Sequence, residues 1–545
     1  MEKDILEIKN LRVIYPNNRI ALSDVSLSVK DGEFIVIMGK DGAGKSTLGL
    51  SIAGLIPRAI KAKLSGTIMI SHQEIKSLKR GEMPHYVGMV FQDFETQLFS
   101  TNVLLEIAFI LENLSLPQSE MKIRIEEVIN LLRIDHLRNR SILNLSGGEK
   151  QLVAIASVLC SKSKILILDE PTTDLDPLGK EMVYDILYKI SGTKIAIDND
   201  SNQALKADRI FIFNDGKAVV RGRPEEILID NEMLQKNGIR PVDTNLIFPG
   251  VLTVEDGINY IRENRINIKP VDFNGEMEKL KEPIIECESL YFGYERNKPV
   301  LHNIELKINQ GDFLGIIGQN GSGKTTLTKL FCGLLLPQKG RIKIKGRDIR
   351  TYQRREIGSL VGYVFQNPDH QIFCNTVKEE VSFALKNFNW DDSRIEQAVK
   401  EALEVCDLNG YEDKDPFSLT TGEKQRLAMA TVLAFKPPII ILDEPTTGLD
   451  YNQQRMIMDV LKSLNQKGYT IIIITHSMWV AAEYTKRAIV MSSGRIVFDL
   501  PTRELFTMEE ELLKYHLEPP QICRLGNRMG LKILSVEEFK KCLYT

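Results

Sequence analysis

The stretch GKDGAGKS, from Gly39 to Ser46, decides the fold of this chain, and GQNGSGKT, from Gly318 to Thr325, repeats it. Each copy follows an apolar run typical of a buried strand (EFIVIMG or DFLGIIG) and precedes a helix-like run. Glycines let successive backbone N–H groups turn toward one centre, and a helix N-terminus adds partial positive charge there. The order strand, glycine-rich turn, helix therefore predicts a phosphate-binding P-loop in each half.

The chain is a duplication whose register shifts once, by five residues, between the P-loop and the FQ glutamine. Lys45 and Lys324 lie 279 positions apart (324 − 45), whereas Asp169 and Asp443 lie 274 apart (443 − 169). A repeat of this length is a whole domain, and 545 residues are too many for one core. We expect irregular tails after each domain. The expected division is domain 1 at 1–229, a linker with the C-terminal extension of domain 1 at 230–283, domain 2 at 284–510 and a C-terminal extension at 511–545.

Composition narrows the class of protein. Hydrophobic residues make up 43% and charged residues 26%, with a formal net charge of -3, which argues against a dedicated nucleic-acid binder. No apolar run approaches the roughly 20 residues that a membrane-spanning helix needs. The N-terminal stretch MEKDILEIKN shows no signal peptide, and the seven scattered cysteines are typical of a reduced compartment.

Each P-loop carries side chains suited to binding a nucleoside triphosphate and Mg²⁺. Lys45 and Lys324 are expected to reach the β- and γ-phosphates, and the next residue in each half, Ser46 or Thr325, offers Mg²⁺ a hydroxyl. A chance glycine-rich turn is the alternative interpretation. Two matches, each between a strand and a helix, make that alternative unattractive.

Carboxylates follow a second buried strand in each half. Asp169 and Asp443 end the apolar runs ILILD and IIILD, where a carboxylate can hold Mg²⁺. Glu170 and Glu444 come next and are placed to polarise an attacking water. A solvated acidic pair is the alternative for either half taken alone.

A third motif makes the pattern specific. LSGGEKQ spans Leu145–Gln151 and LTTGEKQ spans Leu419–Gln425. P-loop, FQ, LSGGE, LDEPT and a late histidine, in this order, resemble the nucleotide-binding domain of an ABC transporter. The resemblance covers nearly the whole chain, twice. It implies an α/β fold of two tandem P-loop NTPase domains, each with a RecA-like core, an antiparallel β subdomain and a helical subdomain.

The resemblance also implies ATP and Mg²⁺ as cofactors and assigns roles by position. The implied nucleotide-binding residues are Tyr15, Gly39, Lys40, Asp41, Gly42, Ala43, Gly44, Lys45, Ser46 and Thr47 in the first half, Tyr294, Gly318, Gln319, Asn320, Gly321, Ser322, Gly323, Lys324, Thr325 and Thr326 in the second, and Ser146, Gly147, Gly148, Thr420 and Gly422 in the signature motifs. The implied metal-holding residues are Ser46, Gln92 and Asp169, and Thr325, Gln366 and Asp443. The implied catalytic residues are Glu444, His476, Glu170, Gln366 and Gln92, with Asp176 and Asp450 in loops between the two ATP sites.

The two sites are expected to differ. In this family each ATP lies between the P-loop of one domain and the signature of the other, and the site of the second P-loop with the first signature keeps every expected residue. In the other site Asn199 stands where the second half has His476, and Thr421 replaces the first glycine of the second signature. We therefore expect hydrolysis mainly at the site built on Glu444. Neutral drift with both sites active is the alternative.

A subclass is indicated by FQNPDHQIF (Phe365–Phe373), its weaker copy FQDFETQLF, and HLEPPQICRLGNRMG (His516–Gly530). These resemble the duplicated ATPase of energy-coupling factor (ECF) importers for vitamins, cobalt or nickel. The resemblance implies a peripheral subunit on the cytoplasmic face of the cell membrane, driving a transmembrane coupling protein and a substrate-binding membrane protein, with no nucleic acid.

Two alternatives stay open. A soluble ABC-F-type ATPase acting on ribosomes fits poorly, because residues 230–282 hold ten Asp/Glu against seven Lys/Arg. A fused ATPase of a sugar-type importer is disfavoured, because both P-loops are intact.

Overall fold

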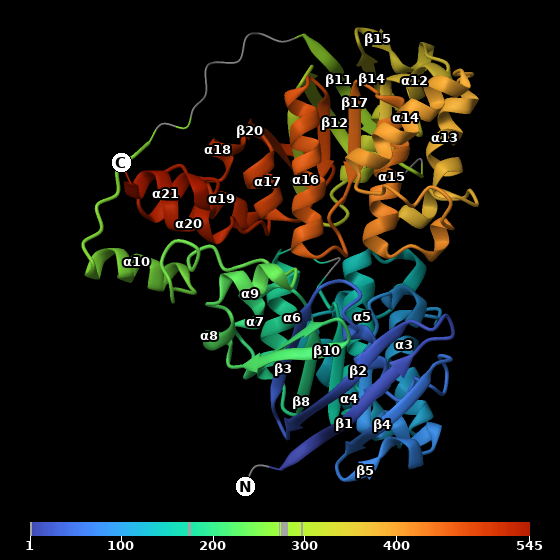
Figure 1. Ribbon diagram of the computed structural model, residues 1–545, viewed down its shortest axis with the longest axis vertical. Coiled ribbons are helices and arrows are strands. Elements are labelled where there is room, and N and C mark those ends of the chain that lie inside the picture. Colours follow the sequence, from blue (N-terminus) through green and yellow to red (C-terminus); the bar gives the residue numbers. More distant parts are fainter. Residues whose placement is uncertain are drawn as a thin grey trace. The chain divides into compact units, whose positions relative to one another are not determined.

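The computed structural model describes residues 3–172, 175, 177–271, 273, 282–295 and 298–544. The chain divides into two compact units, Met1–Leu252 and Thr253–Thr545, and each contains one copy of the repeat. Each unit is built from a six-stranded sheet, a four-stranded antiparallel sheet and helices packed around them (Figure 1). The predicted fold class, two tandem α/β domains of P-loop type, is confirmed.

The core sheet has the same strand order in both units, β10-β9-β3-β8-β7-β6 in the first and β20-β19-β13-β18-β17-β16 in the second. Its strands are parallel except at one edge, where β9 and β10, or β19 and β20, are antiparallel. The strands are β3 (Phe34–Gly39), β6 (Val87–Val90), β7 (Ile165–Asp169), β8 (Thr193–Ile197), β9 (Arg209–Asn214), β10 (Lys217–Gly222), β13 (Phe313–Gly318), β16 (Val361–Val364), β17 (Ile439–Asp443), β18 (Thr470–Ile474), β19 (Arg487–Ser492) and β20 (Arg495–Pro501).

The antiparallel sheet is formed by two strands before the P-loop and two strands after it in each unit, with the order β2-β1-β4-β5 or β12-β11-β14-β15. Its long strands alternate buried and exposed residues, as expected for a sheet with one face in the core. The strands are β1 (Asp4–Ile14), β2 (Ile20–Lys30), β4 (Lys63–Ile70), β5 (Gln73–Glu74), β11 (Pro283–Phe292), β12 (Leu301–Asn309), β14 (Lys339–Ile344) and β15 (Arg347–Asp348).

Helices fill the stretch between the FQ glutamine and the signature motif. Two helices lie there in each unit and pack against a third that begins in the signature motif: α3 (Val103–Asn113) and α4 (Gln118–Leu132) with α5 (Gly147–Leu159), and α13 (Val377–Asn387) and α14 (Asp392–Val405) with α15 (Thr421–Phe435). The other helices around the sheets are α1 (Lys45–Ile52), α2 (Met83–Tyr86), α6 (Pro177–Lys189), α7 (Ser201–Ala204), α8 (Pro224–Ile227), α11 (Lys324–Phe331), α12 (Arg354–Leu360), α16 (Tyr451–Gln466), α17 (Met478–Tyr484) and α18 (Thr502–Leu505).

Two hydrophobic clusters lie in each unit, one on either face of the core sheet. Successive residues of β3 point to opposite faces, so Phe34, Val36 and Met38 belong to the cluster that includes the helices. Ile35 and Ile37 belong to the cluster shared with the antiparallel sheet. Burial on both faces explains why every residue of this strand is apolar or glycine. The buried strand also holds the start of the P-loop in place.

The tails are helical, which corrects the expectation of irregular structure. Residues 231–252 pack into the first unit, where Leu234, Ile239 and Leu252 join its core cluster. Val254 begins the next helix, which belongs to the second unit and contacts a helix of the C-terminal extension (Figure 1). Short helices with a single apolar stripe gave little periodic signal in the sequence. The tail helices are α9 (Asn231–Lys236), α10 (Val254–Glu263), α19 (Glu509–Lys514), α20 (Gln521–Arg528) and α21 (Val536–Tyr544).

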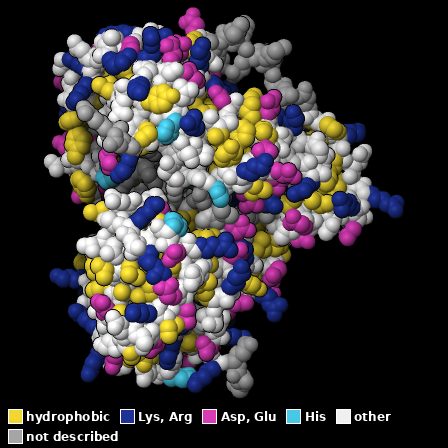
Figure 2. Space-filling model, turned by 180° about the vertical axis from the view of Figure 1, so that it is seen from behind, with side chains coloured by type: hydrophobic (Ala, Val, Ile, Leu, Met, Phe, Trp, Pro, Cys, Tyr) yellow, Lys and Arg dark blue, Asp and Glu magenta, His cyan; other side chains and the backbone are white. Residues whose placement is uncertain are grey.

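Charged side chains of both signs are spread over one face of the molecule (Figure 2). On the face shown in Figure 2, Lys and Arg are interspersed with Asp and Glu. This mixed surface agrees with the formal net charge of -3.

Candidate functional site

The glycines of each P-loop are required by close backbone contacts. Gly39 has φ +144°, and a Cβ added to it would lie 2.1 Å from the carbonyl oxygen of Phe213. A Cβ on Gly318 would lie 2.2 Å from the carbonyl oxygen of Met491. Such distances exclude any side chain, so the loop can pass directly from the central strand to α1 or α11.

Each P-loop lysine is buried and bonded to its own loop. The Nζ of Lys45 donates to the carbonyl oxygens of Gly39 at 2.6 Å and Lys40 at 2.9 Å. The Nζ of Lys324 donates to Gly318 and Gln319, both at 2.8 Å. The two ammonium groups therefore lie at the mouth of equivalent loops, beside the helix N-terminus where an anion binds best.

The hydroxyl after each lysine meets the carboxylate at the end of the neighbouring strand. Ser46 Oγ donates to Asp169 Oδ1 at 3.1 Å, and Thr325 Oγ1 donates to Asp443 Oδ1 at 3.3 Å. Burial raises the pKa of Asp169 to about 7 and raises the pKa of Asp443 as well. These hard oxygen donors fit Mg²⁺, whose positive charge would stabilise both carboxylates in their ionised form.

The glutamate after each carboxylate has a strained backbone and a defined partner. Glu170 and Glu444 have backbone φ angles of +49° and +50°, in a region that residues other than glycine rarely adopt. Gln92 Nε2 donates to Glu170 Oε2 at 3.0 Å. His476 Nε2 lies 3.1 Å from Glu444 Oε1, and the His476 backbone N–H donates to Oε2 at 3.2 Å. The predicted histidine–glutamate pair is thus present in the second unit.

Asn199 has a different set of contacts from His476. Its Oδ1 accepts the backbone N–H of Gly39 at 2.9 Å, and its Nδ2 donates to the carbonyl oxygen of Gly39 at 3.0 Å. Both ends of the amide are therefore engaged by one residue of the P-loop. In the first unit this position braces the loop, whereas in the second it contacts the glutamate.

A half-buried carboxylate beside Asn199 was missed by the sequence analysis. Asp198 Oδ2 accepts hydrogen bonds from Thr172 and Tyr184, both at 2.8 Å, and Oδ1 accepts from the Asp200 backbone N–H at 3.0 Å. Aligning IAIDND with IIITHS places Asp198 opposite Thr475, so a carboxylate replacing a neutral side chain was the available signal.

The signature helices begin with equivalent caps. Ser146 caps α5 with Glu149, and Thr420 caps α15 with Glu423, each as a reciprocal capping box. Among the described residues, a Cβ at Gly147 would meet nothing within 4 Å. The corresponding side chain of Thr421 is thus tolerated within its own unit, and any obstruction it causes concerns what approaches from outside.

The remaining predicted residues lie close to the P-loops or outside the described part. The hydroxyls of Tyr15 and Tyr294 contact Thr47 and Thr326 at 3.2 and 3.3 Å. Asp450 caps α16, and Asp176 lies outside the described residues.

Comparison with known proteins fits this geometry. The ABC transporter family model matches residues 22–173 and 301–447. The chain belongs to the ABC transporter family. A "Putative ABC transporter ATP-binding protein" of Caldanaerobacter subterraneus subsp. tengcongensis is 41% identical, with 99% of both chains covered. One of Methanosarcina acetivorans is 36% identical, covering 99% of this chain and 93% of the relative.

A solved structure, "Structure of cbiO1 from clostridium perfringens: Part of the ABC transporter complex cbiONQ", is 34% identical. It covers 45% of this chain and 99% of its own, with a TM-score of 0.40.

Membership of the ABC family makes this chain an ATP-binding component of a transporter. In each ABC domain the P-loop lysine, the hydroxyl of the next residue, the aspartate expected to hold Mg²⁺ and the following glutamate lie at the carboxyl ends of the core strands. No helix within the described part of the chain combines the length and apolar character that crossing a bilayer requires.

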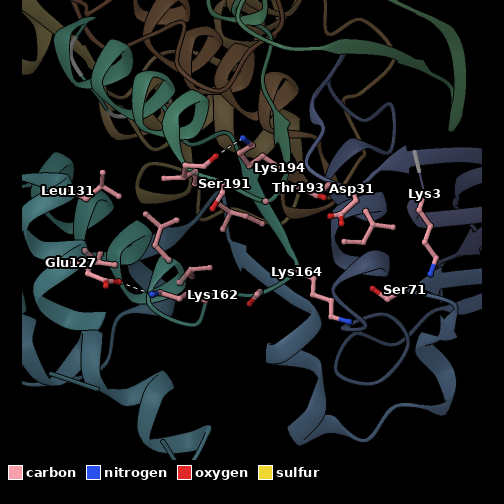
Figure 3. A pocket seen from close by; sticks show the side chains of 18 of the residues that line it. Lys3, Asp31, Ser71, Glu127, Leu131, Lys162, Lys164, Ser191, Thr193 and Lys194 are labelled. Carbon is pink, nitrogen blue, oxygen red and sulfur yellow. Dashed lines mark hydrogen bonds and ion pairs between the residues drawn. The ribbon is translucent and has the colours of Figure 1, made fainter. Parts of the chain in front are cut away.

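A separate cavity of about 830 Å³ opens at the other end of the first sheet (Figure 3). Lys164, Thr193 and Lys194 line it at the amino ends of β7 and β8, together with Glu127 and Lys162, which form an ion pair of 2.7 Å. None of the predicted site residues lines this cavity. The predicted chemistry therefore belongs to the P-loop end of the sheet.

Proposed function

We propose that this chain is the ATP-hydrolysing, energy-coupling subunit of an ECF-type ABC importer. It would act at the cytoplasmic face of the membrane and drive integral transport subunits. The ECF assignment rests on two stretches of sequence, FQNPDHQIF (Phe365–Phe373) with its weaker copy in the first half, and HLEPPQICRLGNRMG (His516–Gly530). The observation that carries the coupling role is an exposed aromatic pair that follows the FQ glutamine in both ABC domains.

The aromatic pairs are built alike. Phe99 and Phe109 are 62% and 41% exposed, and their rings meet edge to face with centroids 4.5 Å apart. Phe373 and Phe383 are 58% and 43% exposed, with centroids 4.7 Å apart. Exposed paired aromatics cost free energy in water and are enriched where a partner covers them. A helix of a membrane subunit with an apolar face suits each pair.

A buried carboxylate holds each pair in place. Glu106 is 3% exposed, and its Oε2 accepts the backbone N–H groups of Phe99 at 3.1 Å and Ser100 at 2.8 Å. Glu380 is also 3% exposed and accepts Phe373 and Cys374 at 2.9 and 2.7 Å. The same device in two domains supports a preformed docking platform, because ordering the loop in advance reduces the entropy lost on binding.

We further infer that hydrolysis occurs mainly at the site of the second P-loop, completed by Ser146, Gly147 and Gly148 of the first signature. The support is the contact of His476 with Glu444, set against the contact of Asn199 with Gly39. The first P-loop, completed by the second signature, would bind ATP and hydrolyse it slowly.

The chain's own groups suit in-line attack of water on the γ-phosphate. Glu444 would accept a proton from the water, and His476 would hold that carboxylate in place. Lys324 would bind the β- and γ-phosphates through its Nζ. Mg²⁺, held by Thr325, Gln366 and Asp443, would supply positive charge against the phosphate oxygens.

Photocrosslinking tests the coupling role. The full chain carries p-benzoylphenylalanine at Phe383, or at Tyr188 as a control, a 65% exposed side chain on α6 outside the platform. Each variant is expressed in its own host, illuminated and purified under denaturing conditions, and the adduct is identified by mass spectrometry. We expect the Phe383 variant to capture a polytopic membrane protein and the Tyr188 variant to leave it uncaptured.

Capture of ribosomal proteins at Phe383 would contradict this proposal and favour the ABC-F-type alternative. Equal capture of the membrane protein at Tyr188 would contradict the assigned platform.

A further inference from the structure

The metal-holding carboxylate of the second ABC domain is held by two hydroxyls. Asp443 Oδ1 accepts from Thr325 Oγ1, the hydroxyl that follows the P-loop lysine. Asp443 Oδ2 accepts from the phenol of Tyr363 at 2.9 Å. Tyr363 lies on β16, beside β17, which ends in Asp443, and had no role assigned from the sequence.

The phenol is itself held from two sides. Its oxygen lies 3.4 Å from Thr328 Oγ1, which donates to the carbonyl oxygen of Thr325 at 3.1 Å. The Phe365 ring packs against the Tyr363 ring with centroids 4.9 Å apart. Tyr363 as a whole is half-buried. Its contacts nevertheless restrict the ring and direct its O–H toward the carboxylate. The carboxylate is thereby fixed in rotation as well as in position.

The first ABC domain has a matched apolar pair in this place. Met89 stands opposite Tyr363 (363 − 89 = 274), and Gly49 stands opposite Thr328 (328 − 49 = 279), each at the offset of its own segment. A Cβ on Gly49 would lie 3.2 Å from Met89 Cε. The methionine methyl therefore takes the space that a threonine side chain needs. Both hydroxyls have been exchanged together for a close-packed apolar contact.

We propose that Tyr363 is a positioning residue that fixes Asp443 for Mg²⁺, and that the Gly49–Met89 pair denies Asp169 the same support. Hydrogen bonds to metal-holding carboxylates set the direction of their lone pairs, and their loss typically weakens metal binding about 10- to 100-fold. The inference rests on the proposed Mg²⁺ site of the second domain and is independent of the membrane partner. It adds a further difference between the halves, in the same direction as the presence of Asn199 where the second half has His476.

Mn²⁺ binding measured by electron paramagnetic resonance tests this directly. The full chain carries Lys45→Ala, so that the non-hydrolysable analogue AMP-PNP occupies mainly the second P-loop, and Mn²⁺ replaces Mg²⁺ as the probe. Tyr363→Phe keeps the ring and removes only the hydroxyl. We expect its Mn²⁺ dissociation constant to rise about tenfold, with AMP-PNP binding in EDTA unchanged.

Two further variants make the outcome decisive. Tyr363→Met with Thr328→Gly installs the pair that already packs in the first domain, so folding is expected, and it should weaken Mn²⁺ binding as much as Tyr363→Phe. Met89→Leu in the first domain should leave the Mn²⁺ constant within about twofold, because it keeps an apolar residue there.

Unchanged Mn²⁺ affinity in Tyr363→Phe or in the transplanted pair would overturn the assignment to Tyr363. Failure of the Lys45→Ala chain itself to bind AMP-PNP would instead contradict the proposed function. The two failures are therefore distinguishable.

Discussion

Asn199 and His476 occupy the same place in the repeat, yet they contact different parts of the nucleotide site. The imidazole of His476 lies against Glu444, whereas the amide of Asn199 closes two hydrogen bonds with Gly39. An amide can donate and accept at once, which suits it to bridging a peptide unit. In the first unit Asn199 therefore holds the P-loop. In the second unit the same position contacts the glutamate that is proposed to polarise water.

Alanine at these two positions should have opposite consequences. Asn199→Ala removes two hydrogen bonds and should lower the free energy of unfolding by about 1–3 kcal/mol, while ATP turnover stays within about threefold of the parent. His476→Ala should lower turnover about a hundredfold or more and barely change stability. Steady-state ATPase rates and urea unfolding measure both quantities, and similar ATPase losses in the two variants would refute the distinction.

Asp198 should give the first unit a recognisable pH dependence. Burial, and then the neighbouring Asp200, raise the pKa of this carboxyl, while Lys180 opposes the shift. The folded state then keeps a proton that the unfolded state has lost, so the free energy of unfolding falls as pH rises above about 4. Asp198→Asn cannot titrate, so its stability relative to the parent should improve between pH 5 and pH 8.

Urea unfolding followed by circular dichroism at the two pH values measures this difference. Glu181→Gln, an exposed carboxyl on α6, is the matched control and should show no such trend. Parallel pH profiles for Asp198→Asn and the parent would show that the carboxyl is not the source.

The local motifs named the candidate site residues, but they did not indicate the residues that hold those side chains in place. Lys45 and Glu444 follow from local motifs, because their roles depend on a strand, a turn and a helix that are contiguous in sequence. The bond of Asn199 to Gly39 and that of Tyr363 to Asp443 join segments 160 and 80 positions apart. Such pairs form only when parallel strands come side by side, so no local pattern predicts them.

At the scale of single elements, the buried carboxylate of Glu380, near the start of α13, orders the exposed segment that precedes the helix. Glu380 satisfies two backbone N–H groups of the segment that carries Phe373. Charge-assisted hydrogen bonds to backbone N–H groups are stronger than neutral ones. The exposed rings are therefore supported by a buried carboxylate.

Glu380→Ala should loosen this platform, whereas Glu379→Ala, one residue earlier and exposed, should not. Leaving two N–H groups without their acceptor should lower the free energy of unfolding by about 2 kcal/mol or more. Both tryptophans, Trp390 and Trp479, lie in the second unit, so their fluorescence reports its unfolding. Crosslinking through position 383 should fall with Glu380→Ala alone, and an equal fall with Glu379→Ala would contradict the mechanism.

The sequence indicated the long elements better than the short ones. The strand Phe34–Gly39 is apolar throughout because both of its faces are covered, which is visible in the text itself. Helix α10 has only three buried residues, Val254, Gly257 and Ile261, and its neighbour α20 lies far along the chain. An apolar helix face of three residues can be recognised only once the helix that packs against it is known.

At the scale of the whole molecule, the boundary between the units falls after Leu252, within the stretch 230–283 that was expected to hold the extension of domain 1 and the linker. Residues 231–252 contribute Leu234, Ile239 and Val242 to the core of the first unit. Each such side chain stabilises the folded state by about 1.5–3 kcal/mol when fully buried. The tail of the first domain is thus part of its fold.

A fragment of residues 1–252 should therefore unfold cooperatively, whereas 1–229 should be less stable by several kcal/mol and prone to aggregate. Thermal unfolding of the two fragments, side by side, measures the difference. Equal midpoints would show that the tail adds nothing to the first unit.

In the proposed function the fused ABC domains would pair with each other, and their unequal sites would divide ATP binding from ATP hydrolysis. This division is the central claim, and ATP turnover in Glu444→Gln and Glu170→Gln tests it most directly. We predict that Glu444→Gln lowers the rate by about two orders of magnitude, while Glu170→Gln keeps a substantial fraction of the parent rate. Equal losses in the two variants would contradict the claim.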